Sequence, residues 1–153
     1  MAKNAAIETF RARCRQAFRF LEHEYGFAER RLPTQHGINR CQVQYVRSAT
    51  LVAVEGIHWG SGIDVRVGRV EPEAWETWRH YGLEDLLHLR CPELSIIGPD
   101  GFSVSRDPSF QLTHYAHALK TCAEDVLRGD FSVLPQLHQM VERRAKPFSS
   151  GMA

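Results

Sequence analysis

The chain has 153 residues, of which 43% are hydrophobic and 24% are charged, and its formal net charge at pH 7 is +1. This length is enough for one domain with a proper core, and the near-neutral charge gives no overall attraction to nucleic acid or to an anionic membrane. No apolar run approaches the roughly 20 residues that cross a membrane. Because the N-terminus also lacks the apolar stretch of a signal peptide, we expect a cytoplasmic protein.

An amphipathic helix is predicted at residues 4–25. Apolar side chains recur there at intervals of three and four, which places them along one stripe: Ile7, Phe10, Cys14, Phe18, Leu21 and Tyr25. Gly26 follows, and glycine is the residue type that most often ends a helix. The opposite face mixes arginines with glutamates, a pattern typical of a solvated helix surface.

An antiparallel meander of about four strands is predicted next. The strand patterns cover residues 40–48, 51–54 and 63–67, with a weaker edge strand at 30–35. Apolar and polar residues alternate in residues 40–48 and 63–67, as in half-buried strands, and residues 51–54 form a continuous apolar run. Pro33 disfavours a central strand at its own position. The glycines of residues 60–62 permit a tight reversal between the last two strands. The expected polar face of the sheet carries Gln42, Gln44, Glu55, Asp64 and Arg66.

The rest of the chain is predicted to be mainly helical. Helical patterns cover residues 71–82, 83–89, 108–127 and 131–141, and residues 94–102 suggest an extended piece followed by a Pro-Asp-Gly turn. Asp107 and Pro108 form a typical helix start. We therefore predict a single α+β domain at residues 1–148, with an N-terminal helix, the meander, and C-terminal helices packed on one sheet face. Residues 149–153 are expected to be a disordered tail.

The cysteines and histidines offer few recognisable sites. The four cysteines are far apart and form no CxxC pair, so we expect small buried thiols. His114 and His117 are three residues apart on a predicted helix, and with His36, His58, His80 or His88 they could bind a metal. No recognised metal motif, nucleotide-binding loop or nucleophile elbow is present. We therefore predict no cofactor and assign no catalytic residue.

The polar residues around the second reversal are the first candidates for a binding site. His58 and Trp59 lie at the mouth of this turn, and Asp64 and Arg66 follow it. Trp is a common anchor of protein interfaces, although a Trp here can also fold over the hairpin and cap the core. The carboxylates of the most acidic region are the second set of candidates: Glu71, Glu73, Glu76, Glu84 and Asp85.

Two phrases of the sequence carry a resemblance to known proteins. FLEHEYGF ends the first helix at residues 20–27, and DVLRGDF separates two helices at residues 125–131. With the strand pair between them, the chain resembles small bacterial proteins of uncharacterised families, many encoded near toxin genes and taken to be immunity proteins of polymorphic or contact-dependent toxin systems. The resemblance implies a non-catalytic module that binds and inhibits a toxin domain. The acidic region would then suit a basic nuclease toxin by electrostatic complementarity.

Two other functions remain open at this point. A small enzyme that uses histidine and carboxylate groups, with or without a metal, would gather His58, Asp64 and a helical histidine in one pocket. A homodimer could form through the sheet edge or through the Trp59 hairpin. We expect a protein partner, and we expect neither a membrane nor a nucleic acid as the binding partner.

Overall fold

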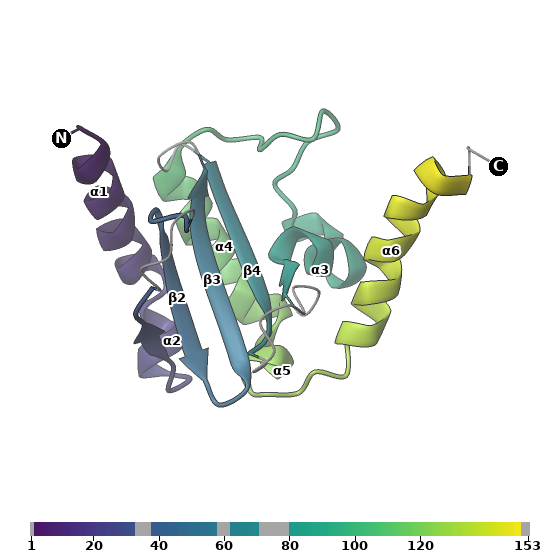
Figure 1. Ribbon diagram of the computed structural model, residues 1–153, viewed down its shortest axis with the longest axis horizontal. Coiled ribbons are helices and arrows are strands. Elements are labelled where there is room, and N and C mark those ends of the chain that lie inside the picture. The colour runs from purple at the N-terminus through teal and green to yellow at the C-terminus, as the bar shows by residue number, and fades with distance from the viewer. Residues whose placement is uncertain (1, 33–37, 58–61, 71–79, 151–153) are drawn as a thin grey trace.

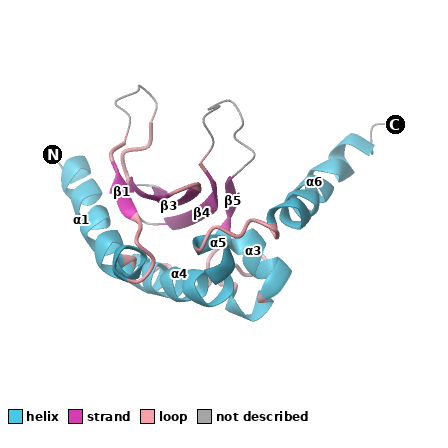
Figure 2. Cartoon of the chain, turned by 90° about the horizontal axis from the view of Figure 1, so that it is seen from below, coloured by secondary structure: helices cyan, strands magenta, loops and turns pink. Residues whose placement is uncertain are grey.

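The structure is a computed structural model that describes residues 2–32, 38–57, 62–70 and 80–150; for residues 2, 3, 80 and 145–150 it describes the backbone alone. The fold is α+β, as predicted. Helices cover one face of a five-stranded antiparallel sheet, and no helix formed by the described residues lies on the other face (Figures 1 and 2). None of the helices in the described part of the chain combines the length and the apolar character that spanning a bilayer requires.

The sheet is a simple meander whose strands lie side by side in chain order. Its strands are β1 (Ala28–Arg30), β2 (Gln42–Arg47), β3 (Thr50–Ile57), β4 (Gly62–Arg69) and β5 (His80–Gly82). The register pairs Val43 with Val54, and Val54 in turn with Val65. Because neighbouring side chains on a strand point to opposite faces, this row of valines faces the helices, while Glu55, Asp64 and Arg66 face the other side.

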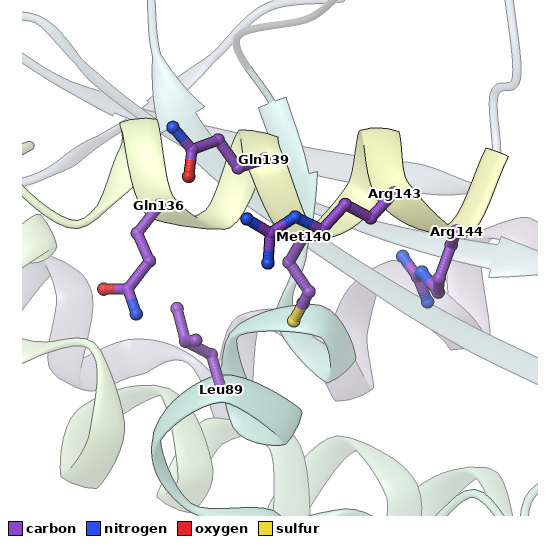
Figure 3. A pocket seen from close by; sticks show the side chains of 6 residues that line it. All are labelled: Leu89, Gln136, Gln139, Met140, Arg143 and Arg144. Carbon is purple, nitrogen blue, oxygen red and sulfur yellow. The ribbon is translucent and has the colours of Figure 1, made fainter. Parts of the chain in front are cut away.

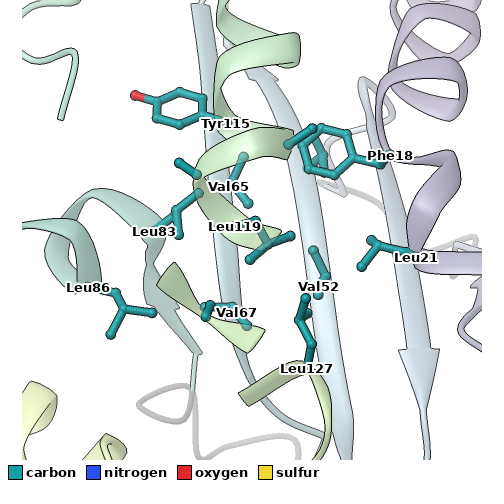
Figure 4. Close-up of a cluster of buried hydrophobic side chains, with 14 of the residues drawn as sticks. Phe18, Leu21, Val52, Val65, Val67, Leu83, Leu86, Tyr115, Leu119 and Leu127 are labelled. Carbon is teal, nitrogen blue, oxygen red and sulfur yellow. The ribbon is translucent and has the colours of Figure 1, made fainter. Parts of the chain in front are cut away.

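The helices and the apolar sheet face enclose one hydrophobic core. The helices are α1 (Ala2–Ala17), α2 (Arg19–His23), α3 (Leu83–Arg90), the short 3-10 helix η2 (Pro92–Leu94), α4 (Pro108–Cys122), α5 (Glu124–Leu127) and α6 (Leu134–Ser150). Figure 4 shows Leu119 of α4 near Val65 and Val52 of the sheet, with Leu83 and Leu86 of α3 to one side and Phe18 to the other; all belong to one core cluster. Phe18, Leu86 and Leu119 are fully buried, and each such side chain contributes about 1.5–3 kcal/mol by its removal from water.

The first predicted helix is divided in two, which corrects the expectation of one helix at residues 4–25. The backbone of Phe18 has φ −100° and ψ 17°, outside the helical range, and separates α1 from α2. Phe18 and Leu21 are both fully buried, so the core is continuous across the break between α1 and α2. Gly26 has φ +73°, the left-handed conformation expected of a glycine beyond a helix end.

The prediction of a helix at residues 71–82 is wrong at its C-terminal end. Residues 80–82 form β5, which pairs with β4 through Val67 and Tyr81, and residues 71–79 lie outside the described part. Pairing with the edge of β4 and burial of Tyr81 prevail over the local helical pattern. At the other edge, β1 begins and ends earlier than the predicted 30–35 strand, before Pro33, which cannot donate to a ladder.

The later helices follow the prediction more closely. α3 is one residue longer than predicted, and the side chain of Asp107 caps α4 by accepting a hydrogen bond from the Ser109 amide at 3.0 Å. The helix predicted at 108–127 is interrupted at Ala123, where φ is −118°, so that α4 and α5 are separate. α6 extends to Ser150, so residues 149 and 150, predicted as the start of a disordered tail, are helical. Residues 151–153 of that predicted tail lie outside the described part.

Candidate functional site

The helix-free sheet face carries the predicted cluster of charges. Glu55 of β3 lies directly opposite Asp64 of β4, and Nη1 of Arg66 is 3.7 Å from Oδ2 of Asp64. Burial, and then the negative charge of Asp64, raise the pKa of the Glu55 carboxyl, while Arg66 opposes this. Asp64 and Arg66 are partly exposed, so their pair contributes little to stability. The cluster is a polar surface that holds one carboxyl with a raised pKa.

A chain of amide hydrogen bonds continues this face across β2. Arg30 donates to Oε1 of Gln44 at 3.0 and 2.6 Å, and Gln44 donates to Oε1 of Gln42 at 3.0 Å. Gln42 then donates to the carbonyl oxygen of Asn39 at 2.6 Å. The polar groups of these side chains therefore already have hydrogen-bond partners within the fold. His58 and Trp59 lie outside the described residues, so their proposed part in binding stays a prediction.

The two described carboxylates of the acidic region are engaged within the fold. Oε1 of Glu84 accepts a hydrogen bond from the Ser95 hydroxyl at 2.6 Å, and Oε2 accepts from the Ile96 amide at 3.2 Å and the Tyr115 hydroxyl at 2.7 Å. Oδ1 of Asp85 forms an ion pair with Arg144 of α6 at 2.6 Å. Glu84 thus positions the chain that follows α3, and Asp85 positions α6. Glu71, Glu73 and Glu76 lie outside the described residues.

The segment held by Glu84 folds into a small hairpin between α3 and α4. Ile97 and Ser103 form an antiparallel bridge, the Gly98 amide donates to the Phe102 carbonyl at 2.8 Å, and the Val104 amide donates to the Ile96 carbonyl at 2.7 Å. Gly101 turns the chain with φ +84°, which only glycine adopts without strain. This confirms the predicted Pro-Asp-Gly turn and an extended piece before it, which starts after Leu94 because Leu94 ends η2.

The hairpin presents apolar side chains to solvent. Phe102 and Val104 are 74% and 71% exposed, and Phe110, in the first turn of α4, is 44% exposed. We call the two exposed side chains of the hairpin, Phe102 and Val104, the Phe102 surface. Phe110 stacks on the ring of His114, with 5.8 Å between ring centroids and 19° between planes. Exposed apolar groups on an ordered segment are typical of protein–protein contact sites.

Sequence reasoning missed the Phe102 surface, although a local signal was present. Phe102 and Val104 follow the Pro-Asp-Gly turn and alternate with serines, which is typical of a short strand with one apolar face. The direction of that face could not be read from the sequence, because it depends on Glu84 and Tyr115, which are distant in the chain.

The side chains of His114 and His138 are hydrogen-bonded within the fold, and no side-chain hydrogen bond joins His117 to His114. Nε2 of His114 lies 2.6 Å from the Leu94 carbonyl oxygen, and His138 lies between the Tyr81 hydroxyl at 2.9 Å and Glu142 at 3.0 Å. Within the described ranges, no three His, Cys, Asp or Glu residues come together in a way that could hold a metal ion. His36 and His58 lie outside those ranges.

Three of the four cysteines are buried, as predicted, and Cys91 is partly buried. Burial raises the pKa of Cys14 to about 12 and that of Cys122 to about 12. A thiolate is the nucleophilic form of cysteine. Because a raised pKa keeps both thiols neutral, Cys14 and Cys122 are unreactive core groups.

Comparison with known proteins adds no identity to this geometry: no family model, no curated protein and no solved structure matches the chain.

Proposed function

We propose that the chain is a non-catalytic protein-binding module, and that the Phe102 surface is its principal docking site. The observation that carries the proposal is the exposure of Phe102 and Val104 on a hairpin fixed by hydrogen bonds. Holding large apolar groups in water brings no benefit to folding, whereas their burial by a partner contributes about 1.5–3 kcal/mol for each side chain.

The order of the hairpin supports a binding role. A disordered apolar segment loses conformational entropy when it binds, whereas a segment that is already fixed loses little. Here the Glu84 carboxylate fixes the start of the segment, and the amide of Gln111 fixes its end by donating to the Ser105 carbonyl at 2.7 Å. The partner is therefore expected to present an apolar recess to a preformed ridge.

We further propose that the partner is a bacterial toxin domain and that the chain is an immunity-type inhibitor, acting in the cytoplasm of the cell that makes it. The two quoted phrases of the sequence and the small α+β architecture support this proposal. A tight inhibitor needs a rigid interface with a few apolar anchors, and the Phe102 surface provides anchors of this type.

Co-purification from the native host with four forms of the protein tests the proposal. The forms are the wild type, F102S/V104S, W59A and E71K/E73K/E76K. We expect one stoichiometric partner with a toxin-like domain to bind the wild type and to be lost with F102S/V104S. Retention by F102S/V104S together with loss in W59A would assign the interface to the hairpin between β3 and β4 instead and contradict the proposed site.

The E71K/E73K/E76K form tests the acidic region separately. Glu84 and Asp85 are left intact in this variant because they hold Ser95 and Arg144, respectively. If the partner is a basic nuclease domain, charge reversal should slow its association and weaken binding, most clearly at low salt. Unchanged binding at low salt would exclude electrostatic recognition by these three glutamates.

A further inference from the structure

A second surface, distinct from the Phe102 surface, lies between α3 and α6. Leu134 and Leu137 bury the first turns of α6 in the core, whereas its C-terminal half points away from the sheet (Figure 1). Two polar contacts fix the helix in this position, from His138 to the Tyr81 hydroxyl and from Arg144 to Asp85. α6 therefore stands over α3 with a groove between them.

The groove has an apolar floor and polar walls. It has a volume of about 730 Å³ and is lined by Leu89, Gln136, Gln139, Met140, Arg143 and Arg144. Figure 3 shows Gln136 and Met140 extending from α6 toward Leu89 of α3. Leu89 and Met140 also pack against the edge of the core. The volume falls in the range of about 300–1,000 Å³ that is typical of binding sites for small molecules or single anchor side chains.

The charge of the lining is one-sided. Among the residues that the structure describes, two arginines line the groove and no carboxylate does. Asp85 balances Arg144, but among the described residues Arg143 has no ion-pair partner and Gln136 and Gln139 have no hydrogen-bond partner. The groove thus offers a guanidinium to a carboxylate, two amides to a peptide backbone, and a thioether and a leucine to an apolar side chain.

We propose that the α3–α6 groove binds an acidic segment of a partner protein, with one apolar side chain seated between Leu89 and Met140 and a neighbouring carboxylate on Arg143. Charge complementarity selects this occupant, because a basic segment would place like charges beside both arginines. This site is independent of the Phe102 surface, and either can bind without the other.

Titration of the ¹⁵N-labelled protein with short peptides tests the proposal. Each peptide carries one leucine, methionine or phenylalanine, flanked by glutamates in one series and by lysines in the other. Some peptides of the glutamate series should shift the backbone amides of Leu89, Gln139 and Arg143, and the lysine series should not. R143E should weaken the glutamate series about tenfold or more, the loss of one charge-assisted contact.

R13E is the matched control, since Arg13 is exposed on α1 at the opposite end of the molecule (Figure 1). It makes the same charge change and should leave peptide binding unaltered. The proposal is overturned if no glutamate peptide binds, if both variants weaken binding equally, or if the shifted amides lie elsewhere. It is also overturned if the groove amides shift with protein concentration alone and light scattering shows a dimer, because the occupant would then be a second copy of the chain.

Discussion

The hydroxyl of Tyr115 donates a hydrogen bond to Oε2 of Glu84 at 2.7 Å, and the same carboxylate holds Ser95 and the amide of Ile96. One side chain in the first turn of α3 therefore ties α4 to the start of the hairpin that carries the Phe102 surface. Hydrogen bonds to a charged acceptor are stronger than those between neutral groups. Glu84 is not part of the proposed binding surface, but it holds the hairpin that carries this surface, and we assign it as a positioning residue.

Replacing Glu84 with glutamine should loosen the hairpin. The introduced amide would have a single oxygen acceptor where the structure uses two, so at least one donor loses its partner. We expect E84Q to lower the free energy of unfolding by about 1–3 kcal/mol and to speed hydrogen exchange at the amides of Gly98 and Val104. E93Q is the control, because Glu93 is an exposed carboxylate of η2. If E84Q and E93Q have the same stability and exchange, the positioning role is wrong.

Replacing Glu55 with glutamine should stabilise the protein at neutral pH. Burial and the charge of Asp64 raise the pKa of Glu55. At a pH above the ordinary glutamate pKa, ionising Glu55 therefore costs more free energy in the folded state than in the unfolded state. The neutral amide removes that cost, and we expect a gain of up to about 1 kcal/mol at pH 7. Urea unfolding at pH 7 and pH 3 measures it. The gain should vanish at pH 3, where Glu55 is protonated in both states; a gain of equal size at both pH values would refute the electrostatic cause.

The Arg90–Asp125 pair should stabilise the packing of α3 on the α4–α5 junction. Two guanidinium nitrogens of Arg90 each lie 2.7 Å from an oxygen of Asp125, and Nη1 also donates to the Cys122 carbonyl at 2.9 Å. Lysine cannot reproduce this forked geometry. We expect R90K to cost about 1–2 kcal/mol at pH 7, whereas R128K, whose partner Glu124 is exposed, should change stability by less than about 0.5 kcal/mol.

The pH dependence of R90K provides a further check. The hydrogen bond from Arg90 holds the pKa of Asp125 below its ordinary value. The resulting stability is therefore present above that ordinary value and is lost as the pH falls and Asp125 takes up a proton. The difference between the wild type and R90K should shrink in acid. A difference that stays constant down to about pH 2 would assign the effect to packing alone.

Stability should fall in alkali because of the buried thiols. Burial raises the pKa of Cys14 in the folded protein to about 12. The stability that the neutral thiol contributes is therefore fully present below the ordinary thiol pKa and is lost as the pH rises toward 12. The slope is at most about 1.4 kcal/mol per pH unit for one thiol. Serine does not titrate in this range, so C14S should flatten the urea-derived stability curve between about pH 9 and pH 11. An unchanged slope would contradict this assignment.

The sequence predicted the parts of the fold that depend on local pattern. Alternation in β2 and β4 set their faces correctly, the apolar run at residues 51–54 marked β3, and the Asp107 cap and the glycine at position 26 marked helix ends. The bend at Phe18 and the strand at Tyr81 could not be predicted, because each depends on packing against distant residues. Phe18 is fully buried in the core, and Tyr81 pairs with Val67 and is hydrogen-bonded to His138.

The candidate sites depended even more on distant contacts. Glu84 was proposed as a binding carboxylate because its region is acidic, yet its partners include Tyr115, 31 positions away. Leu89 and Met140, the floor of the α3–α6 groove, come from separate helices with no shared motif. Composition identified which groups are charged, but only the fold shows which charges are already used.

The central claim is that the Phe102 surface binds a protein partner. The most direct test is the dissociation constant of the purified partner for the wild type and for F102S/V104S, measured by calorimetry together with the thermal stability of both forms. We predict a loss of affinity of about a hundredfold or more, as expected when two anchor side chains are removed, with little change in stability because both side chains are exposed. Equal affinities for two folded proteins would contradict the claim.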